Sequence, residues 1–242
     1  FGPHDPYSCP AEYAQRHDPS GISPPPNHDD SLEDRPAVYR RHRRELWDRI
    51  PWGDQAKAIA RYWGACSLID NYVGRLLAVL EESGQADNTL VIYAADHPDM
   101  MGSHGLFLKG IYPYEAGWRI PMILRWPGHF PEGVQESEAY VSLLDIAPTV
   151  LRAAGLDPWS DAQGTPLQEL LDTPIPDERR SFYGEFHGGE YYYTQRVLWS
   201  DHHKMVFNPF DEQDELYDLQ NDPHERHNLA HDTASRDLAD DM

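Results

Sequence analysis

The sequence predicts an α/β fold, in which part of a doubly wound mixed sheet is flanked by helices and a small antiparallel sheet follows near the C-terminus. Three observations predict it. Apolar positions recur at the helical period from Asp54 to Ser83. Short apolar runs at 90–95 and 122–126 are typical of core strands. After about residue 172 the chain becomes rich in aromatic and β-branched residues. We therefore expect two units, 1–172 and 173–242.

Residues 1–53 are expected to be mostly irregular, with a proline-rich loop around Pro24-Pro25-Pro26. The basic cluster Arg40–Arg44 is best explained as a solvated helix face, and a patch that contacts substrate or partner is the alternative. A long helix is predicted next, with Asp54 as its N-cap and Gly84 just beyond its end. Its apolar face would consist of Ala56, Ile59, Ala60, Trp63, Ile69, Val73, Leu76, Leu77 and Leu80.

Two core strands and a second helix follow. The run Leu90–Ala95 is short, apolar and partly β-branched, which is typical of a strand buried on both faces in a parallel sheet. Met122–Trp126 is a similar run. Asp145 is predicted to cap a helix that has Pro148 in its first turn and Gly155 after its end.

The part of the chain after about residue 172 has a different amino-acid composition. Ser181–Phe186, Tyr191–Trp199 and Lys204–Asn208 are rich in aromatic and β-branched residues with turns between them, so they predict a small antiparallel sheet. The last stretch, Asp232–Met242, is predicted to be a helix.

Composition limits the function classes. The 242 residues carry a formal net charge of −21, which argues against nucleic acid or an anionic membrane as partner. No apolar run approaches the length of a membrane span. Two cysteines, Cys9 and Cys66, do not make a disulfide scaffold. The chain starts at Phe1 without an initiator Met, which we interpret as a cut inside a longer protein, so the cellular compartment stays open.

The residues with the clearest chemistry follow the first predicted strand. Asp96 and His97 would lie at its carboxyl end, where open α/β sheets bind ligands. A carboxylate beside an imidazole makes a plausible pair of ligands for a divalent cation. His104 and Lys109 come soon after and are two possible cationic donors, so an anionic substrate group could be held over the metal.

These residues carry a family resemblance. The segment Asp96–Leu106 with Lys109-Gly110 resembles the sulfatase family of the alkaline phosphatase superfamily, and the match continues in the family's order through most of the chain, at Tyr114-Glu115, Arg119–Gly128, Asp145–Thr149 and Glu215–Leu219. By this resemblance the chain is the C-terminal half of such an enzyme. The resemblance implies an alkaline-phosphatase-like fold and hydrolysis of sulfate monoesters of small molecules or carbohydrates.

The resemblance also implies roles for single residues. Asp96 and His97 would complete a metal site begun by acidic residues in the other half, with Ca²⁺ as the expected ion and Mn²⁺ or another transition ion as the alternative. Lys109 would contact a sulfate oxygen. His4, in Pro3-His4-Asp5-Pro6, would reach the ester oxygen and stabilise it as charge develops. His104 would contact substrate or orient its own loop.

The nucleophile of the family does not occur in this chain. Sulfatases use a formylglycine made from the first residue of Cys/Ser-x-Pro-Ser-Arg, whereas Cys9 precedes Pro-Ala-Glu and Cys66 precedes Ser-Leu-Ile. Formylglycine is therefore expected in the other half, and the isolated chain is expected to be inactive. The pair Asp29-Asp30 lies in a proline-rich loop and is not assigned to the metal.

One departure from the family pattern is Pro98, where a glycine is usual. Proline restrains the preceding residue, here the proposed ligand His97, so we hypothesise that Pro98 shifts metal affinity or preference. Two alternatives to a sulfatase stay open: a phosphonate or phosphate ester hydrolase of the same superfamily, and a non-catalytic remnant that binds a metal or anion. The oligomeric state is also open.

Overall fold

A computed structural model describes residues 2–135, 138–171, 175–189, 192–235, 238–239 and 242. Its α-helices are α1 (Ala11–Ala14), α2 (Ala37–His42), α3 (Trp52–Glu82), α4 (Glu115–Trp118) and α5 (Ile146–Ala153). Its strands are β1 (Val91–Ala94), β2 (Met122–Arg125), β3 (Ser181–Phe186), β4 (Gln195–Ser200), β5 (His203–Phe207) and β6 (Glu215–Asp218). No helix in these ranges combines the length and the hydropathy that crossing a bilayer requires.

The long helix α3 confirms the periodicity of the sequence. It begins two residues before the predicted cap: Pro51 is the N-cap residue, and Asp54 lies in the first turn, where a carboxylate favours the helix dipole. Gly84 follows the end with φ +69°, a backbone conformation that suits glycine. Ala56 and Ile59 near the start are buried, but Leu76 near the end is 67% exposed, so only the first half of the apolar face is covered.

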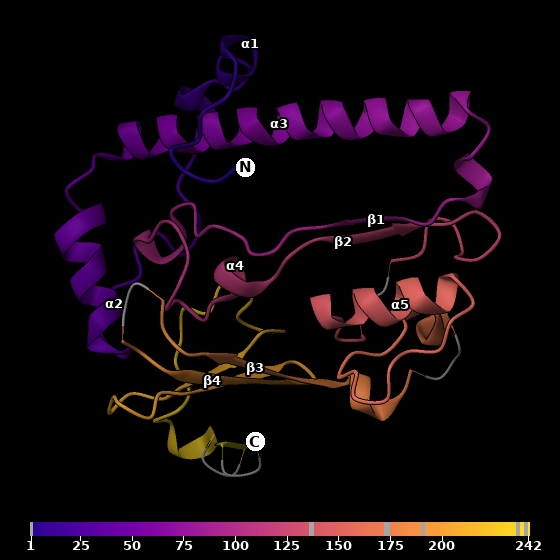
Figure 1. Ribbon diagram of the computed structural model, residues 1–242. Helices are drawn as coiled ribbons and strands as arrows, with labels where there is room; N and C mark the ends of the chain where they lie inside the picture. Colours follow the sequence, from indigo (N-terminus) through magenta and orange to yellow (C-terminus); the bar gives the residue numbers. More distant parts are fainter. Residues whose placement is uncertain (1, 136–137, 172–174, 190–191, 236–237, 240–241) are drawn as a thin grey trace.

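Strands β1 and β2 match the two predicted core strands and form a two-stranded sheet. They run antiparallel, with Val91 opposite Arg125 and Ala94 opposite Met122. The expectation of a parallel partner for Leu90–Ala95 is therefore wrong within the described residues, because the run returns on itself through the long loop that carries the candidate site. In Figure 1, α3 lies on one side of this pair, and α5 and the second sheet lie on the other.

The second sheet is antiparallel in the order β3-β4-β5-β6. Strand β3 has the predicted bounds. Strands β4 and β5 overlap the predicted runs but extend one residue beyond them, to Ser200 and from His203, and Tyr191 lies outside the described residues. Strand β6 was not predicted, because it is short. Of the helix expected at Asp232–Met242, the described part contains only a 3₁₀ turn at Thr233–Ser235 and residues 238–239. The predicted boundary at 172/173 falls outside the described ranges and stays a prediction.

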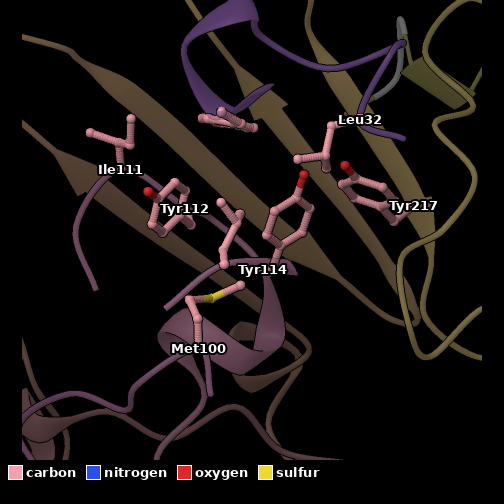
Figure 2. Close-up of a cluster of buried hydrophobic side chains, with 8 residues drawn as sticks. Leu32, Met100, Ile111, Tyr112, Tyr114 and Tyr217 are labelled. Atoms are coloured by element: carbon pink, nitrogen blue, oxygen red, sulfur yellow. The ribbon is translucent and has the colours of Figure 1, made fainter. Parts of the chain in front are cut away.

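A buried aromatic core joins this sheet to the first part of the chain. Tyr114 and Tyr217 pack with Leu32, Met100 and Ile111, as Figure 2 shows. Leu32 comes from the N-terminal segment, Met100 from the loop after β1, and Tyr217 from β6. The loop that carries the candidate site is thus anchored on a core that it shares with the N-terminal segment and with β6.

Asp145 is the N-cap residue of α5, as predicted, but its side chain makes no cap hydrogen bond to that helix. It belongs to a capping box on the preceding 3₁₀ turn, in which Leu144 N donates to Ser142 Oγ and Ser142 N donates to Asp145 Oδ2. The buried Asp145 carboxylate also accepts hydrogen bonds from Arg179. In the basic cluster, Arg40, Arg41 and Arg44 are exposed, as expected for a solvated face.

Candidate active site

Asp96 and His97 lie just past the end of β1, at the predicted place. Their side chains are 87% and 40% exposed, and Asp96 Oδ2 lies 3.8 Å from His97 Nε2. The two donor atoms are therefore close enough for a single ion to contact both. The hydrogen bond that the His97 amide donates to Asp96 Oδ1 lowers the pKa of the Asp96 carboxyl, and the neighbouring imidazole adds to this effect. Asp96 is accordingly an anion at neutral pH.

The second ring nitrogen of His97 fixes its tautomer. Nδ1 lies 2.9 Å from the carbonyl oxygen of Pro98. A carbonyl only accepts hydrogen bonds, so Nδ1 carries the proton and Nε2 keeps its lone pair on the side of Asp96. This is how metal-binding histidines are usually oriented. The two side chains offer an oxygen and a nitrogen of the kinds that divalent ions bind. The described residues contain no group of three or more potential ligands.

Lys109 and His4 meet on the other side of the same region. Lys109 Nζ lies 2.5 Å from His4 Nε2 and 3.3 Å from Asp5 Oδ1. An ammonium group only donates, so Nε2 of His4 is the acceptor in this arrangement. His4 Nδ1 lies 2.9 Å from Asp5 Oδ1, and it is this nitrogen that carries the proton. The rings of His4 and His97 meet edge to face, with centroids 6.3 Å apart.

Four of the five predicted site residues, namely Asp96, His97, His4 and Lys109, line one cavity of about 250 Å³. A carboxylate and an imidazole thus face a lysine and a second imidazole across a space large enough for a tetrahedral oxyanion. The lining residues are Gly2, Pro3, His4, Tyr62, Asp96, His97, Pro98, Asp99 and Lys109.

Two contributors to this cavity were not predicted. Tyr62 comes from α3, where a tyrosine at a helical position looks like any other half-buried residue. Asp99 lies in the motif itself and accepts hydrogen bonds from the Met101 and Leu108 amides and from the Tyr7 hydroxyl. An Asp placed so soon after a strand is a sequence signal for such loop bonding, and it could have identified Asp99.

The expectation that His104 contacts substrate is corrected by its position. His104 is fully buried, its ring stacks on Tyr114 with centroids 3.7 Å apart, and it does not line the cavity. Its Nδ1 bonds Asp30 Oδ2 at 2.8 Å. Of the two roles considered, orientation of the loop is the one that this geometry allows. Asp30 belongs to the same buried pair and is not a metal ligand.

A second group of buried charges is structural. Lys204 is fully buried, pairs with Glu225 and lies 3.5 Å from Glu115. Glu115 also accepts a hydrogen bond from Trp199 Nε1 at 2.8 Å. These contacts hold the segment after the site loop on the four-stranded sheet, and they satisfy charges that would otherwise be costly to bury.

Two family models match the chain. The model of the sulfatase family matches residues 1–156. A second model, described as the C-terminal part of N-sulphoglucosamine sulphohydrolase, matches residues 102–242. The first includes every residue that lines the cavity, so the family pattern and the geometry identify the same part of the molecule.

Several curated relatives are sulfatases. The chain is 31% identical over 248 residues to the uncharacterized sulfatase YidJ of Escherichia coli K12, and this match covers 99% of the chain and 47% of the relative. It is 33% identical over 212 residues to an N-acetylglucosamine-6-O-sulfatase of Bacteroides thetaiotaomicron, covering 83% of the chain and 37% of that protein. The chain therefore spans half or less of the length of these relatives.

Solved structures share the fold. BT4656, in complex with its substrate D-glucosamine-2-N,6-O-disulfate, superposes with a TM-score of 0.84 at 21% identity, over 100% of this chain and 62% of that one. A phosphonate monoester hydrolase of Agrobacterium radiobacter superposes with a TM-score of 0.83 at 25% identity, over 99% of this chain and 53% of that one. The predicted fold class, α/β with a small C-terminal antiparallel sheet, is confirmed.

Proposed function

The chain belongs to the sulfatase family, and we propose from this premise that the whole protein hydrolyses sulfate monoesters. One observation carries the proposal: the Asp96-His97 pair and the His4-Lys109 pair converge on one cavity. Anionic and neutral metal ligands on one side and cationic donors on the other are what a bound sulfate group requires. The proposed substrates are carbohydrate or other small sulfate esters, a class to which the relative from Bacteroides thetaiotaomicron and the ligand of BT4656 also point.

Sulfatases generally use a divalent metal ion and a formylglycine nucleophile. We assign Asp96 and His97 to the metal, because their free donor atoms lie together and the His97 tautomer leaves Nε2 available. When bound, the ion neutralises charge on the sulfate oxygens. Calcium is the proposed ion, since carboxylates would dominate the complete ligand set, and manganese is the alternative because one ligand is an imidazole. The formylglycine would come from outside this chain.

Lys109 is proposed to bind the sulfate group, and His4 is proposed to protonate the leaving oxygen. Lys109 would donate to a sulfate oxygen and hold its charge. His4 would stabilise the ester oxygen that leaves. In the structure Nε2 contacts the Lys109 ammonium. With an ester bound, Lys109 would turn to the sulfate oxygen and keep its charge, and Nε2 of a protonated His4 would donate its own proton to the departing oxygen. Asp5, next to Nδ1, would stabilise the cationic imidazole during this transfer.

Hydrolysis of phosphonate or phosphate esters is a second candidate activity with support of its own. A metal pair and a cationic clamp serve a phosphonate or phosphate ester as well as a sulfate ester, and the likeness to phosphonate monoester hydrolase favours this possibility. A remnant that binds a metal or anion without catalysis is the third candidate, and the absence of a Cys/Ser-x-Pro-Ser-Arg sequence from this chain is what favours it.

Substrate profiling of the full-length protein separates these candidates. The protein would be assayed with 4-nitrophenyl sulfate, glucosamine 6-sulfate and phenyl 4-nitrophenyl phosphonate, before and after removal of metal with a chelator. We expect the highest kcat/KM on a sulfate ester, loss of activity on chelation, and recovery with Ca²⁺. Preference for the phosphonate would establish the second candidate. No turnover of any ester by a protein with an intact upstream nucleophile motif would leave the non-catalytic candidate.

A further inference from the structure

Two loops meet at the cavity, and one hydrogen bond joins them. We propose that Tyr7 and Asp99 are positioning residues that fix His4 opposite the metal-ligand pair. The Tyr7 hydroxyl donates to Asp99 Oδ2 at 2.6 Å, across a sequence separation of 92 residues. The inference rests on the proposed function, because it assigns a task to these residues in the same site, but neither side chain would touch the reacting atoms.

Asp99 holds the loop that carries the other site residues. Its Oδ1 accepts the amide of Met101 at 3.2 Å and the amide of Leu108 at 2.9 Å. Met100 N also donates to Leu108 O at 2.8 Å, so the loop is closed at its base. Asp99 lies two positions after His97, and Leu108 lies directly before Lys109. The Asp99 carboxylate therefore links the part of the loop next to the metal ligands to the part next to Lys109. A shift of Asp99 would move both sides of the cavity.

Tyr7 holds the segment that carries His4. The residue is only 8% exposed and has φ +56°, a left-handed conformation that a bulky residue adopts only where its surroundings impose it. Its ring packs edge to face on Tyr62 of α3, with centroids 5.6 Å apart. Tyr7 N donates to the carbonyl of His4 at 3.3 Å, which closes a turn. The position of the Tyr7 side chain thus sets the position of His4.

The hydroxyl remains a donor throughout the working pH range. Burial raises the pKa of Tyr7 well above its ordinary value, and the bond to Asp99 raises it further. A bond from a neutral hydroxyl to a carboxylate is short and directional. It provides what an ion pair between flexible side chains would not, namely a fixed distance between the two loops.

This role has a kinetic signature that a purely structural role lacks. If Tyr7 positions His4, its loss damages proton donation to the leaving oxygen, and that donation matters most for leaving groups of high pKa. The change Tyr7→Phe removes only the hydroxyl and keeps the ring on Tyr62. In the full-length protein we expect kcat/KM to fall roughly 10- to 100-fold for an alkyl or sugar sulfate, the range typical for loss of an outer-shell partner. The loss for 4-nitrophenyl sulfate should be several-fold smaller.

Two further variants sharpen the test. Asp99→Asn keeps an acceptor for the loop amides but loses the charged acceptor of Tyr7, so it should show the same dependence on the leaving group. The double variant Tyr7→Phe/Asp99→Asn should have a kcat/KM no lower than that of the more damaged single variant. Both single changes act on the same hydrogen bond, between the Tyr7 hydroxyl and Asp99, so their effects should not add. Tyr140→Phe is the matched control. The Tyr140 hydroxyl donates to Asp201 O at 2.9 Å, neither residue lines the cavity, and loss of this bond should not change the dependence on the leaving group.

Hydrogen exchange separates failure of this inference from failure of the proposed function. Amides of residues 2–7 should exchange faster in Tyr7→Phe than in the parent and in Tyr140→Phe, whether or not any ester is turned over. An equal loss for all leaving groups, or unchanged exchange of residues 2–7, would overturn the positioning role while leaving a sulfatase intact. If the parent hydrolyses no ester, the exchange comparison alone decides.

Discussion

At the scale of single residues, the contact between Lys109 and His4 makes a direct prediction. Lys109→Ala removes the cation that would hold a sulfate oxygen, and His4→Ala removes the donor to the leaving oxygen. Each is expected to lower kcat/KM of the full-length protein by roughly 10²- to 10³-fold, typical of losing one charge-stabilising donor. Steady-state kinetics on a sugar sulfate, whose leaving oxygen needs a proton, measure it. Lys57→Ala, an exposed lysine of α3 that pairs with Asp54, is the control and should keep full activity.

The residues that sequence could identify are those in contiguous motifs. Asp96, His97 and Lys109 lie within one segment and His4 within another, so local pattern and the family resemblance together selected them, and the structure brings them to one cavity. For His104 the sequence left open whether it contacts substrate or orients its loop, because no pattern reveals that its ring is buried on Tyr114. Burial depends on contacts with distant parts of the chain.

His104 predicts a pH dependence of stability. Burial lowers the pKa of His104 from its ordinary 6.5, although the hydrogen bond with Asp30 opposes this. Within the described residues Nε2 has no hydrogen-bond partner, which also disfavours a proton there. Below pH 6.5 the unfolded chain therefore binds a proton that the folded chain does not, so stability falls as pH falls through this value.

The change His104→Gln removes that titration. We expect the variant to be less stable than the parent at about pH 8 by about 1–3 kcal/mol, since a buried hydrogen bond is disturbed. Its stability should then decline less between about pH 7 and about pH 5. Urea denaturation at both ends of this range measures the difference. Parallel pH curves for the two proteins would contradict the assignment of a neutral, buried imidazole.

Pro98 predicts an effect on metal binding. The Pro98 carbonyl accepts from His97 Nδ1 at 2.9 Å, and the ring of Pro98 restrains the backbone of His97. Pro98→Gly keeps this carbonyl but removes the restraint on the backbone, so metal affinity of the full-length protein is expected to weaken by less than the roughly 10- to 100-fold that complete loss of an outer-shell partner costs. Calorimetric titration with Ca²⁺ and Mn²⁺ gives the affinities. Equal affinities in parent and variant would show that Pro98 has no influence on metal binding.

At the scale of elements, periodicity predicted α3 and β3 well, because their patterns extend over many residues. Strand direction was not predictable in the same way. Leu90–Ala95 is apolar throughout, as in parallel sheets, yet β1 pairs antiparallel with β2. The four-residue β6 was missed, since Leu216 is buried as well as Glu215 and Tyr217, so the strand shows no alternation. Such pairings are decided by tertiary contacts.

Two glycines of α3 give an element-scale prediction with opposite signs. A Cβ on Gly64 would lie 2.4 Å from the carbonyl oxygen of Tyr13 in α1, whereas a Cβ on Gly74 would meet nothing within 4 Å. Gly64→Ala is therefore expected to destabilise by about 1–3 kcal/mol through overpacking. Gly74→Ala should stabilise by up to about 1 kcal/mol through helix propensity.

The pair of variants also tests how α3 supports the site. Because α1 follows the segment that carries His4, displacement of α1 by Gly64→Ala should lower kcat/KM as well as stability, while Gly74→Ala should not change kcat/KM. Thermal denaturation and kinetics on the full-length protein measure both quantities. If the two alanines had the same effect on stability, the close packing of α1 on α3 would be refuted.

At the scale of the whole molecule, large apolar side chains lie exposed on several elements. Leu76 and Val79 on α3 are 67% and 59% exposed, and Ile123 on β2 is 60% exposed. Val150 on α5 is 46% exposed. Leu76, Val79 and Val150 belong to helices that flank the β1–β2 pair in Figure 1, and Ile123 belongs to the pair itself. Exposed apolar surface of this kind marks a site of interaction with other protein. In this family the remaining half of the polypeptide is the natural candidate.

The last prediction concerns the chain by itself. The described residues hold no group of three or more potential metal ligands, and the sequence contains no formylglycine motif, so the isolated 242 residues should bind metal weakly and turn over no ester. Their exposed apolar side chains should bind a hydrophobic dye such as ANS. Adding the upstream polypeptide, expressed separately, should lower the dye signal and restore turnover. Measurable turnover by the isolated chain, with the upstream part absent, would show that the nucleophile and the remaining ligands are not where we place them.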